Sequence, residues 1–88
     1  MNKDDLKEAL KDNQLSYSTV KMSEMANIMK FANVELNMDR TTLDYYYTID
    51  VDELVNSEMP KEELDTLKKQ GWSFSDDGKQ LILFLKNN

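Results

Sequence analysis

The residues of this chain with the clearest chemical potential are carboxylates that lie close together in sequence. Asp50 and Asp52 are two positions apart, and side chains at that spacing on a β-strand project from the same face, where they could share a hard cation. Paired carboxylates can also act as general acid and base. However, no glycine-bearing loop is present to wrap an ion, and 17 acidic residues among 88 make chance pairs unavoidable. We therefore predict no catalytic residues, no metal site and no cofactor.

The residue types that are absent exclude several other chemistries. The chain has no histidine and no cysteine, so Ser-His-Asp and Cys-His mechanisms and Cys- or His-ligated metal sites are excluded. Its two glycines, Gly71 and Gly78, both occupy positions typical of turns or helix ends, so a glycine-rich phosphate loop is also excluded. These absences favour a binding function over an enzymatic one.

Acidic residues are concentrated in the middle of the chain. Between Glu35 and Asp65 there are ten acidic and two basic residues, a net charge of −8 in a chain whose total is −6. Three consecutive tyrosines begin at Tyr45 within this block. Such a segment predicts a surface that meets a basic protein partner. Direct nucleic-acid binding is disfavoured, because phosphate contacts need clustered lysine and arginine. The same acidity could instead mimic nucleic acid, as small inhibitors of DNA-binding proteins do, and would suit a phage or mobile-element accessory protein.

Three segments have the apolar spacing of helices, namely residues 3–13, 23–32 and 60–70. Pro60 at the start of the last segment and Gly71 after its end are typical helix boundaries. Residues 16–22 fit either a short extended piece or the start of the second helix. Asp52 suits the cap of a short turn that follows it.

Alternation of apolar and polar residues predicts two β-hairpins. The first joins residues 34–38 to residues 43–51, and the second joins 72–75 to 79–85 through a turn at Gly78. We therefore predict one small α+β domain over residues 1–88, with the order ααββαββ and a four-stranded antiparallel sheet packed with helices. Trp72, Leu67 and Leu83 are expected in its core.

One face of the predicted sheet is the candidate binding surface. If the leucines of residues 81–85 point under the helices, then Ile82 and Phe84 point the other way, together with alternate residues of the first hairpin. The candidate partner-binding residues are Glu35, Asp44, Tyr46, Asp50, Ile82 and Phe84. An aromatic centre with a charged rim is typical of protein interfaces. The alternative is that the first helix covers Ile82 and Phe84, which would make both faces core.

These observations predict a non-catalytic, acidic protein-interaction module. The alternative is a homo-oligomeric structural subunit, such as a homodimer, that buries Tyr46, Ile82 and Phe84. The longest apolar run, residues 81–85, is far too short to span a membrane, so no membrane contact is expected. A polar N-terminus and the lack of cysteine favour a cytoplasmic location.

Overall fold

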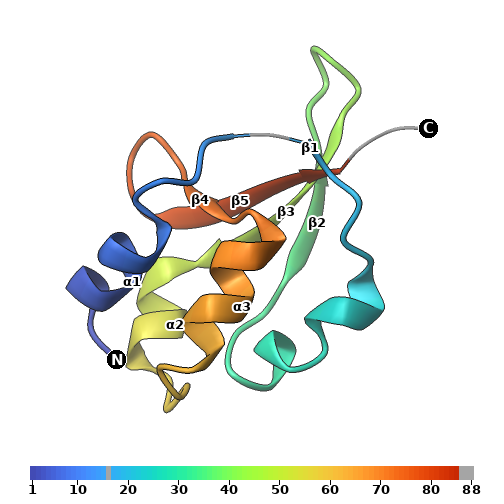
Figure 1. Ribbon diagram of the computed structural model, residues 1–88. Coiled ribbons are helices and arrows are strands. Elements are labelled where there is room, and N and C mark those ends of the chain that lie inside the picture. The colour runs from blue at the N-terminus through green and yellow to red at the C-terminus, as the bar shows by residue number, and fades with distance from the viewer. Residues whose placement is uncertain (16, 86–88) are drawn as a thin grey trace.

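The computed structural model describes residues 1–15 and 17–85, and it combines one β-sheet with helices (Figure 1). The helices are α1 (Lys3–Leu10), α2 (Val51–Asn56) and α3 (Glu63–Gln70), with two short 3₁₀ helices, η1 (Met22–Met25) and η2 (Ile28–Lys30). The strands are β1 (Tyr17–Ser18), β2 (Glu35–Met38), β3 (Tyr45–Asp50), β4 (Ser73–Phe74) and β5 (Gln80–Leu85). This arrangement confirms the α+β class.

The strands form one mixed sheet in the spatial order β1-β5-β3-β2, and β4 also pairs with β5. As predicted, β3 is antiparallel to β2, and β4 is antiparallel to β5. In contrast, β1 lies parallel to β5, so the predicted four-stranded antiparallel sheet and the order ααββαββ are only roughly matched. Of the two alternatives for residues 16–22, the described part forms the short extended piece, since β1 is Tyr17–Ser18. Its pairing with β5 was not predicted, because its partner, Phe84, is distant in sequence.

Residues 23–32 do not form the single helix that their apolar spacing predicts. Instead, η1 and η2 are separate short turns with Ala26 and Asn27 between them. Met25 and Ile28 are buried three positions apart, which matches the three-residue repeat of a 3₁₀ helix. Met29, which the predicted helix would bury on the same face, is 46% exposed. The prediction of one helix here is therefore wrong.

The hairpin of β2 and β3 is confirmed, and it reverses direction through residues 40–43. Asp39 stabilises the turn, since its Oδ1 accepts hydrogen bonds from the backbone N–H groups of Thr41 (2.8 Å) and Thr42 (3.3 Å). Leu43 completes the turn with a φ of 63°, in the left-handed region. That conformation is costly for a residue with a Cβ atom, and the Leu43 side chain is 63% exposed.

The strain at Leu43 predicts a stabilising substitution. Leu43→Asn should raise the free energy of unfolding by about 0.5 kcal/mol, because asparagine tolerates the left-handed region better than leucine. Urea denaturation of both proteins would measure this difference. Leu36→Asn is the matched control, since Leu36 is 53% exposed but lies in an ordinary strand. A loss of stability in Leu43→Asn would contradict the assignment of strain to this turn.

The helices after β3 begin at positions that differ from those predicted. Asp50, not Asp52, is the N-cap of α2, and its Oδ1 accepts a hydrogen bond from the N–H of Glu53 at 2.9 Å. Asp52 lies inside the first turn instead. The third helix begins at Glu63 rather than at Pro60, because residues 60–62 form a turn that leads into it. Its predicted end is confirmed, since Gly71 has a φ of 96°.

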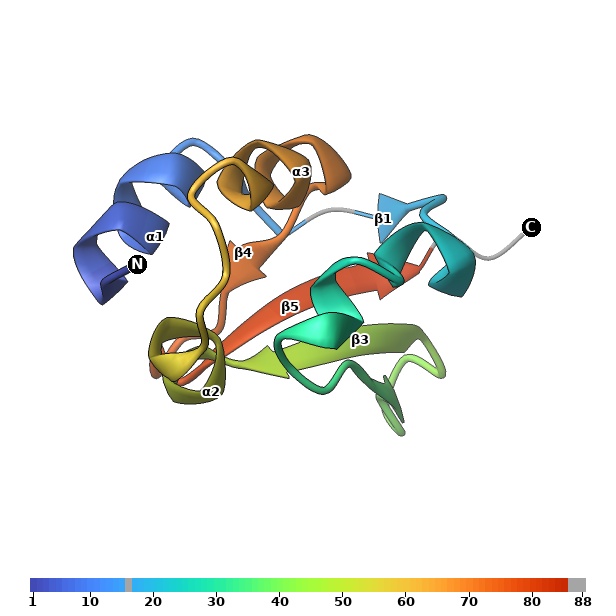
Figure 2. The same ribbon diagram turned by 90° about the horizontal axis from the view of Figure 1, so that it is seen from below.

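The helices gather on one side of the sheet, below β5 in the view of Figure 1, and Figure 2 shows the same molecule from that side. A single core cluster joins the three α-helices to the inward side chains of β3 and β5. Trp72, Leu67 and Leu83 are all buried in this cluster, as predicted. None of the helices in the described residues is long and apolar enough to cross a membrane.

The first helix packs into this same core and does not cover the opposite face of the sheet. Leu6 and Leu10 of α1 are buried in the cluster, whereas Ile82 and Phe84 do not belong to it. In β5, residues alternate between the two faces, so Leu81 and Leu83 point to the helices and Ile82 and Phe84 point away. The alternative in which α1 covers Ile82 and Phe84 is therefore wrong.

Candidate functional site

The side of the sheet that faces away from the helices is here called the outer face. Residues directly opposite each other on antiparallel strands share a face, and the pairings Tyr46–Phe84, Thr48–Ile82, Asp50–Gln80 and Glu35–Thr48 define this one. Five of the six candidate residues, all except Asp44, lie on strands of this face. Asp44 immediately precedes β3 and reaches the same region through a hydrogen bond to β1.

Three aromatic rings form a row across the outer face. The rings of Tyr46 and Phe84 lie with their centroids 5.2 Å apart, and Tyr17 meets Phe84 edge-on at 6.0 Å. Tyr17 is 59% exposed, whereas Tyr46, Ile82 and Phe84 are half-buried by their neighbours on the sheet. The row offers flat apolar surface with exposed edges, which suits stacking against an arginine side chain or an apolar side chain of a partner.

Tyr17 was not among the predicted site residues, and it joins the aromatic row to Asp44. Its hydroxyl group donates a hydrogen bond to Oδ2 of Asp44 at 2.7 Å. This hydrogen bond, and then the charge of Asp44, raise the pKa of the Tyr17 phenol above its ordinary value, with a smaller contribution from the charge of Asp39. Asp39 and Asp44 therefore lie close enough to Tyr17 to make this end of the outer face electronegative.

The pH dependence of this contact has a definite sign. Because the pKa of Tyr17 is higher in the folded chain than in the unfolded chain, the stabilisation is complete below about pH 10 and is lost as the pH rises through the folded value. In a titration of phenolate absorbance, Tyr17→Phe should remove a late-ionising tyrosine. Asp44→Asn should move the pKa of Tyr17 back toward its ordinary value. Loss of a tyrosine of ordinary pKa in Tyr17→Phe, together with an unchanged titration in Asp44→Asn, would contradict the hydrogen bond.

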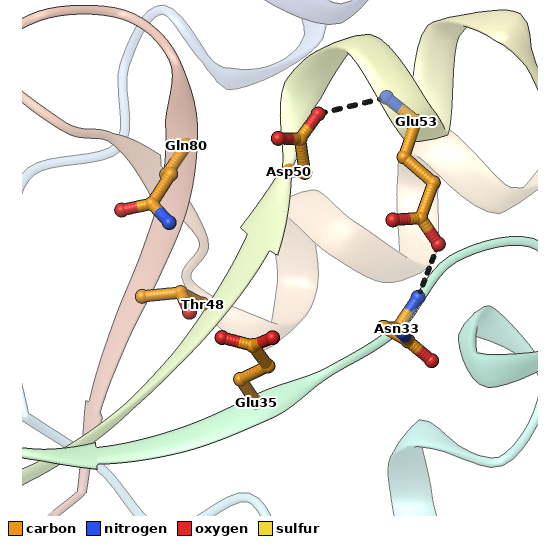
Figure 3. Close-up of a pocket in the computed structure, with 6 residues that line it drawn as sticks. All are labelled: Asn33, Glu35, Thr48, Asp50, Glu53 and Gln80. Atoms are coloured by element: carbon orange, nitrogen blue, oxygen red, sulfur yellow. Dashed lines mark hydrogen bonds between the residues drawn. The ribbon is translucent and has the colours of Figure 1, made fainter.

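An acidic pocket lies at the other end of the outer face, next to the start of α2 (Figure 3). It has a volume of about 170 Å³ and is lined by Asn33, Glu35, Thr48, Asp50, Glu53 and Gln80. One oxygen of Asp50 caps α2, and Oε1 of Glu53 accepts a hydrogen bond from the N–H of Asn33 at 2.8 Å. Glu35 extends from β2 toward the same space. Three carboxylates around one small pocket favour an ammonium or guanidinium group as its occupant.

The structure therefore brings the predicted residues together as two acidic ends with an aromatic centre between them. Glu35 and Asp50 line the pocket, Asp44 lies at the opposite end of β3, and Tyr46, Ile82 and Phe84 lie between. Sequence reasoning missed Tyr17, Asn33, Glu53 and Gln80. Of these four, only Glu53 has a signal in the sequence, because it lies three residues after Asp50, the spacing expected between a helix cap and the residue that it caps. No group of three acidic side chains among residues 1–15 and 17–85 is arranged to hold a metal ion.

The arrangement can attract and orient a cationic group, but the chain offers no histidine or cysteine to move a proton or attack a substrate near neutral pH. Carboxylates can pair with an ammonium or guanidinium group, and aromatic rings can pack against the apolar stem of such a side chain. Comparison of this chain with protein-family models, with curated proteins and with solved structures finds no match.

Proposed function

We propose that this chain is a non-catalytic interaction module whose outer face binds a basic surface of a partner protein. The observation that carries the proposal is the position of the aromatic row of Tyr17, Phe84 and Tyr46. It lies on the face without helices, between Asp44 at one end and the pocket of Glu35 and Asp50 at the other. An apolar centre within a charged rim is the usual anatomy of a protein–protein interface.

The carboxylates and the aromatic residues of the outer face have different roles in binding. The carboxylates steer a basic partner toward the outer face and fix its orientation, so they act mainly on the association rate. The aromatic row loses water on binding and slows dissociation. In this proposal the chain works in the cytoplasm, and its partner is a protein with lysine and arginine exposed, including a nucleic-acid-binding protein whose basic groove the acidic face would occupy.

A homodimer through the outer face is less favourable than a complex with a basic protein. A homodimer through Tyr46, Ile82 and Phe84 would bring two copies of an acidic face together, and each chain carries a net charge of −6. Like charges across such an interface are unfavourable. Charge complementarity therefore favours a basic partner over a second copy.

The test uses a short peptide of arginines around a central leucine, here called the basic probe, and its glutamate counterpart as control. The basic probe should shift the amide NMR signals of the outer face, around Tyr17, Tyr46 and Phe84, and should leave those of α1 and α3 unchanged. The glutamate peptide should shift neither set. Shifts confined to the helices, or a stable dimer in sedimentation that persists at high salt, would contradict the proposal.

A further inference from the structure

The free edge of β2 is an edge of the sheet that another chain could pair with. In the strand order β1-β5-β3-β2, this strand is last and is paired with β3 alone among the described residues. An unpaired edge presents a row of backbone N–H and C=O groups that can bond to a further strand. Here the edge belongs to the hairpin whose turn projects well beyond the helices in Figure 1.

The register of the hairpin identifies which backbone groups face outward. The N–H of Asp39 donates to the carbonyl oxygen of Asp44 at 2.8 Å, so these two residues form a hydrogen-bonded pair. In an antiparallel ladder, such pairs alternate with non-hydrogen-bonded pairs. The odd-numbered residues of β2 therefore bond to β3, and Leu36 and Met38 direct their N–H and C=O groups to the free edge.

The side chains along this edge differ sharply between the two faces. On the helix side, Leu36 and Met38 are 53% and 45% exposed, and Tyr45 beside Met38 is 44% exposed. On the outer face, alternation places Glu35 at the start of the strand and Asn37 within it, and Asp39 follows directly after the strand's end at Met38. The edge thus presents apolar surface on one face and a carboxylate at each end of the other.

We propose that the free edge of β2 receives an extended segment of the basic partner as an added antiparallel strand. The inference rests on the proposed function and names its binding mode. Residues opposite Glu35 and Asp39 would share the outer face with those carboxylates and should be lysine or arginine. Residues opposite Leu36 and Met38 would extend the apolar surface. The recognised pattern is therefore basic, apolar, polar, apolar, basic.

A second copy of this chain fits the same edge poorly. Pairing of Leu36 with Met38 of the copy sets Glu35 directly opposite Asp39, and pairing of Leu36 with Leu36 sets Glu35 opposite Asn37, so neither register brings a lysine or arginine to Glu35 or Asp39. Directly opposed like charges destabilise a strand pair. Charge complementarity therefore selects a basic segment as the occupant.

The test compares two peptides of the same composition and charge on the full chain. The matched peptide is Lys-Ile-Thr-Val-Lys, and the control, Ile-Lys-Thr-Lys-Val, moves the lysines to the wrong face. The matched peptide should bind about tenfold more tightly, and it should slow hydrogen exchange of the Leu36 and Met38 amides. N-methylation of its isoleucine and valine should abolish binding, whereas N-methylation of its threonine should not, because only the first two amides face β2.

The outcomes separate this inference from the proposed function. Equal binding of both peptides, with shifts on the outer face, would overturn strand addition and leave the proposed function standing. Failure of these peptides and of the basic probe would overturn both. If sedimentation shows a dimer, and hydrogen exchange shows that the Leu36 and Met38 amides are protected in it, the occupant of the edge is a second copy. That result would also overturn the inference. These readouts need no substitution in the chain, so they do not depend on a variant that folds.

Discussion

Replacement of Trp72 by alanine is expected to remove about 3–5 kcal/mol from the free energy of unfolding, the range typical of a large buried aromatic side chain. The Trp72 side chain is fully buried, and its indole Nε1 donates a hydrogen bond to Oε1 of Gln70 at 2.9 Å. Its backbone joins two further segments, because its N–H donates to the carbonyl oxygen of Leu67 and its carbonyl oxygen accepts from Asn13. Since small domains have only about 5–15 kcal/mol of stability, much of the population would unfold.

Urea denaturation would measure this loss, with Tyr45→Ala as the control for truncation of an aromatic residue that is 44% exposed. The control should cost far less, because less apolar surface is buried there. Trp72 is the only tryptophan, so its fluorescence reports its environment directly. Emission at the wavelength of a water-exposed indole in the native chain, or a loss below about 1 kcal/mol in Trp72→Ala, would contradict the burial of Trp72.

The largest effect on binding is expected from Tyr46→Ala. Tyr46 lies at the centre of the outer face and packs on Phe84 at 5.2 Å, so a partner would cover it fully. Truncation of such an anchor costs about 2 kcal/mol, which corresponds to a rise of about thirtyfold in the Kd for the basic probe. The rise should come mainly from faster dissociation.

Met29→Ala is the control for this prediction, because Met29 is 46% exposed but lies in η2, outside the sheet. Surface plasmon resonance of both variants would give their rates. A similar loss of affinity in Met29→Ala and Tyr46→Ala would show that the outer face is not the binding surface. Thermal melts should accompany these measurements, so that loss of fold is distinguished from loss of binding.

The parts of the fold that sequence predicted correctly are those that local chemistry determines. Two-residue alternation in residues 34–38 and 43–51 identified the hairpin and the residues that share a face. It did not predict how much of the apolar face is covered, since Leu36, Met38 and Tyr45 remain exposed. The glycine at position 71 marked the end of α3, since few other residues adopt its φ of 96°. The burial of Trp72 followed from its place between a helix end and a hairpin.

The parts that sequence missed depend on contacts between distant segments. The sequence allowed a short extended piece at Tyr17 and Ser18, but local patterns could not show that it pairs with β5 at the far end of the chain. The spacing of Met22, Met25 and Met29 suited an α-helix, but the chain buries Met25 and Ile28 in tighter turns. For the same reason, Tyr17 was absent from the predicted site, although it touches both Phe84 and Asp44.

The face of each candidate residue could be predicted, but the composition of the acidic pocket could not. Alternation alone placed Tyr46, Ile82 and Phe84 together. The pocket depends on the register that sets Glu35 opposite Thr48, and on the cap that fixes Asp50 beside Glu53. Spacing alone does not decide which of two neighbouring acidic residues caps a helix. Asp52 was the predicted cap of α2, whereas Asp50 is the cap in the structure.

The most direct test of the central claim is to remove the charges of the outer face without removing its hydrogen bonds. The variant Glu35→Gln/Asp44→Asn/Asp50→Asn keeps an acceptor for the Tyr17 hydroxyl group and for the α2 cap. The control, Asp12→Asn/Glu58→Gln/Glu62→Gln, removes the same number of charges from exposed positions outside the sheet.

Calorimetric titration with the basic probe at about 0.05 M and about 0.5 M NaCl would compare the two variants with the native chain. At low salt, the outer-face variant should bind about tenfold more weakly, from roughly 0.5 kcal/mol for each lost charge, and should lose most of its salt dependence. The control should bind like the native chain. Equal weakening of both variants would mean that the probe senses only the net charge of the chain, and it would contradict a binding site on the outer face.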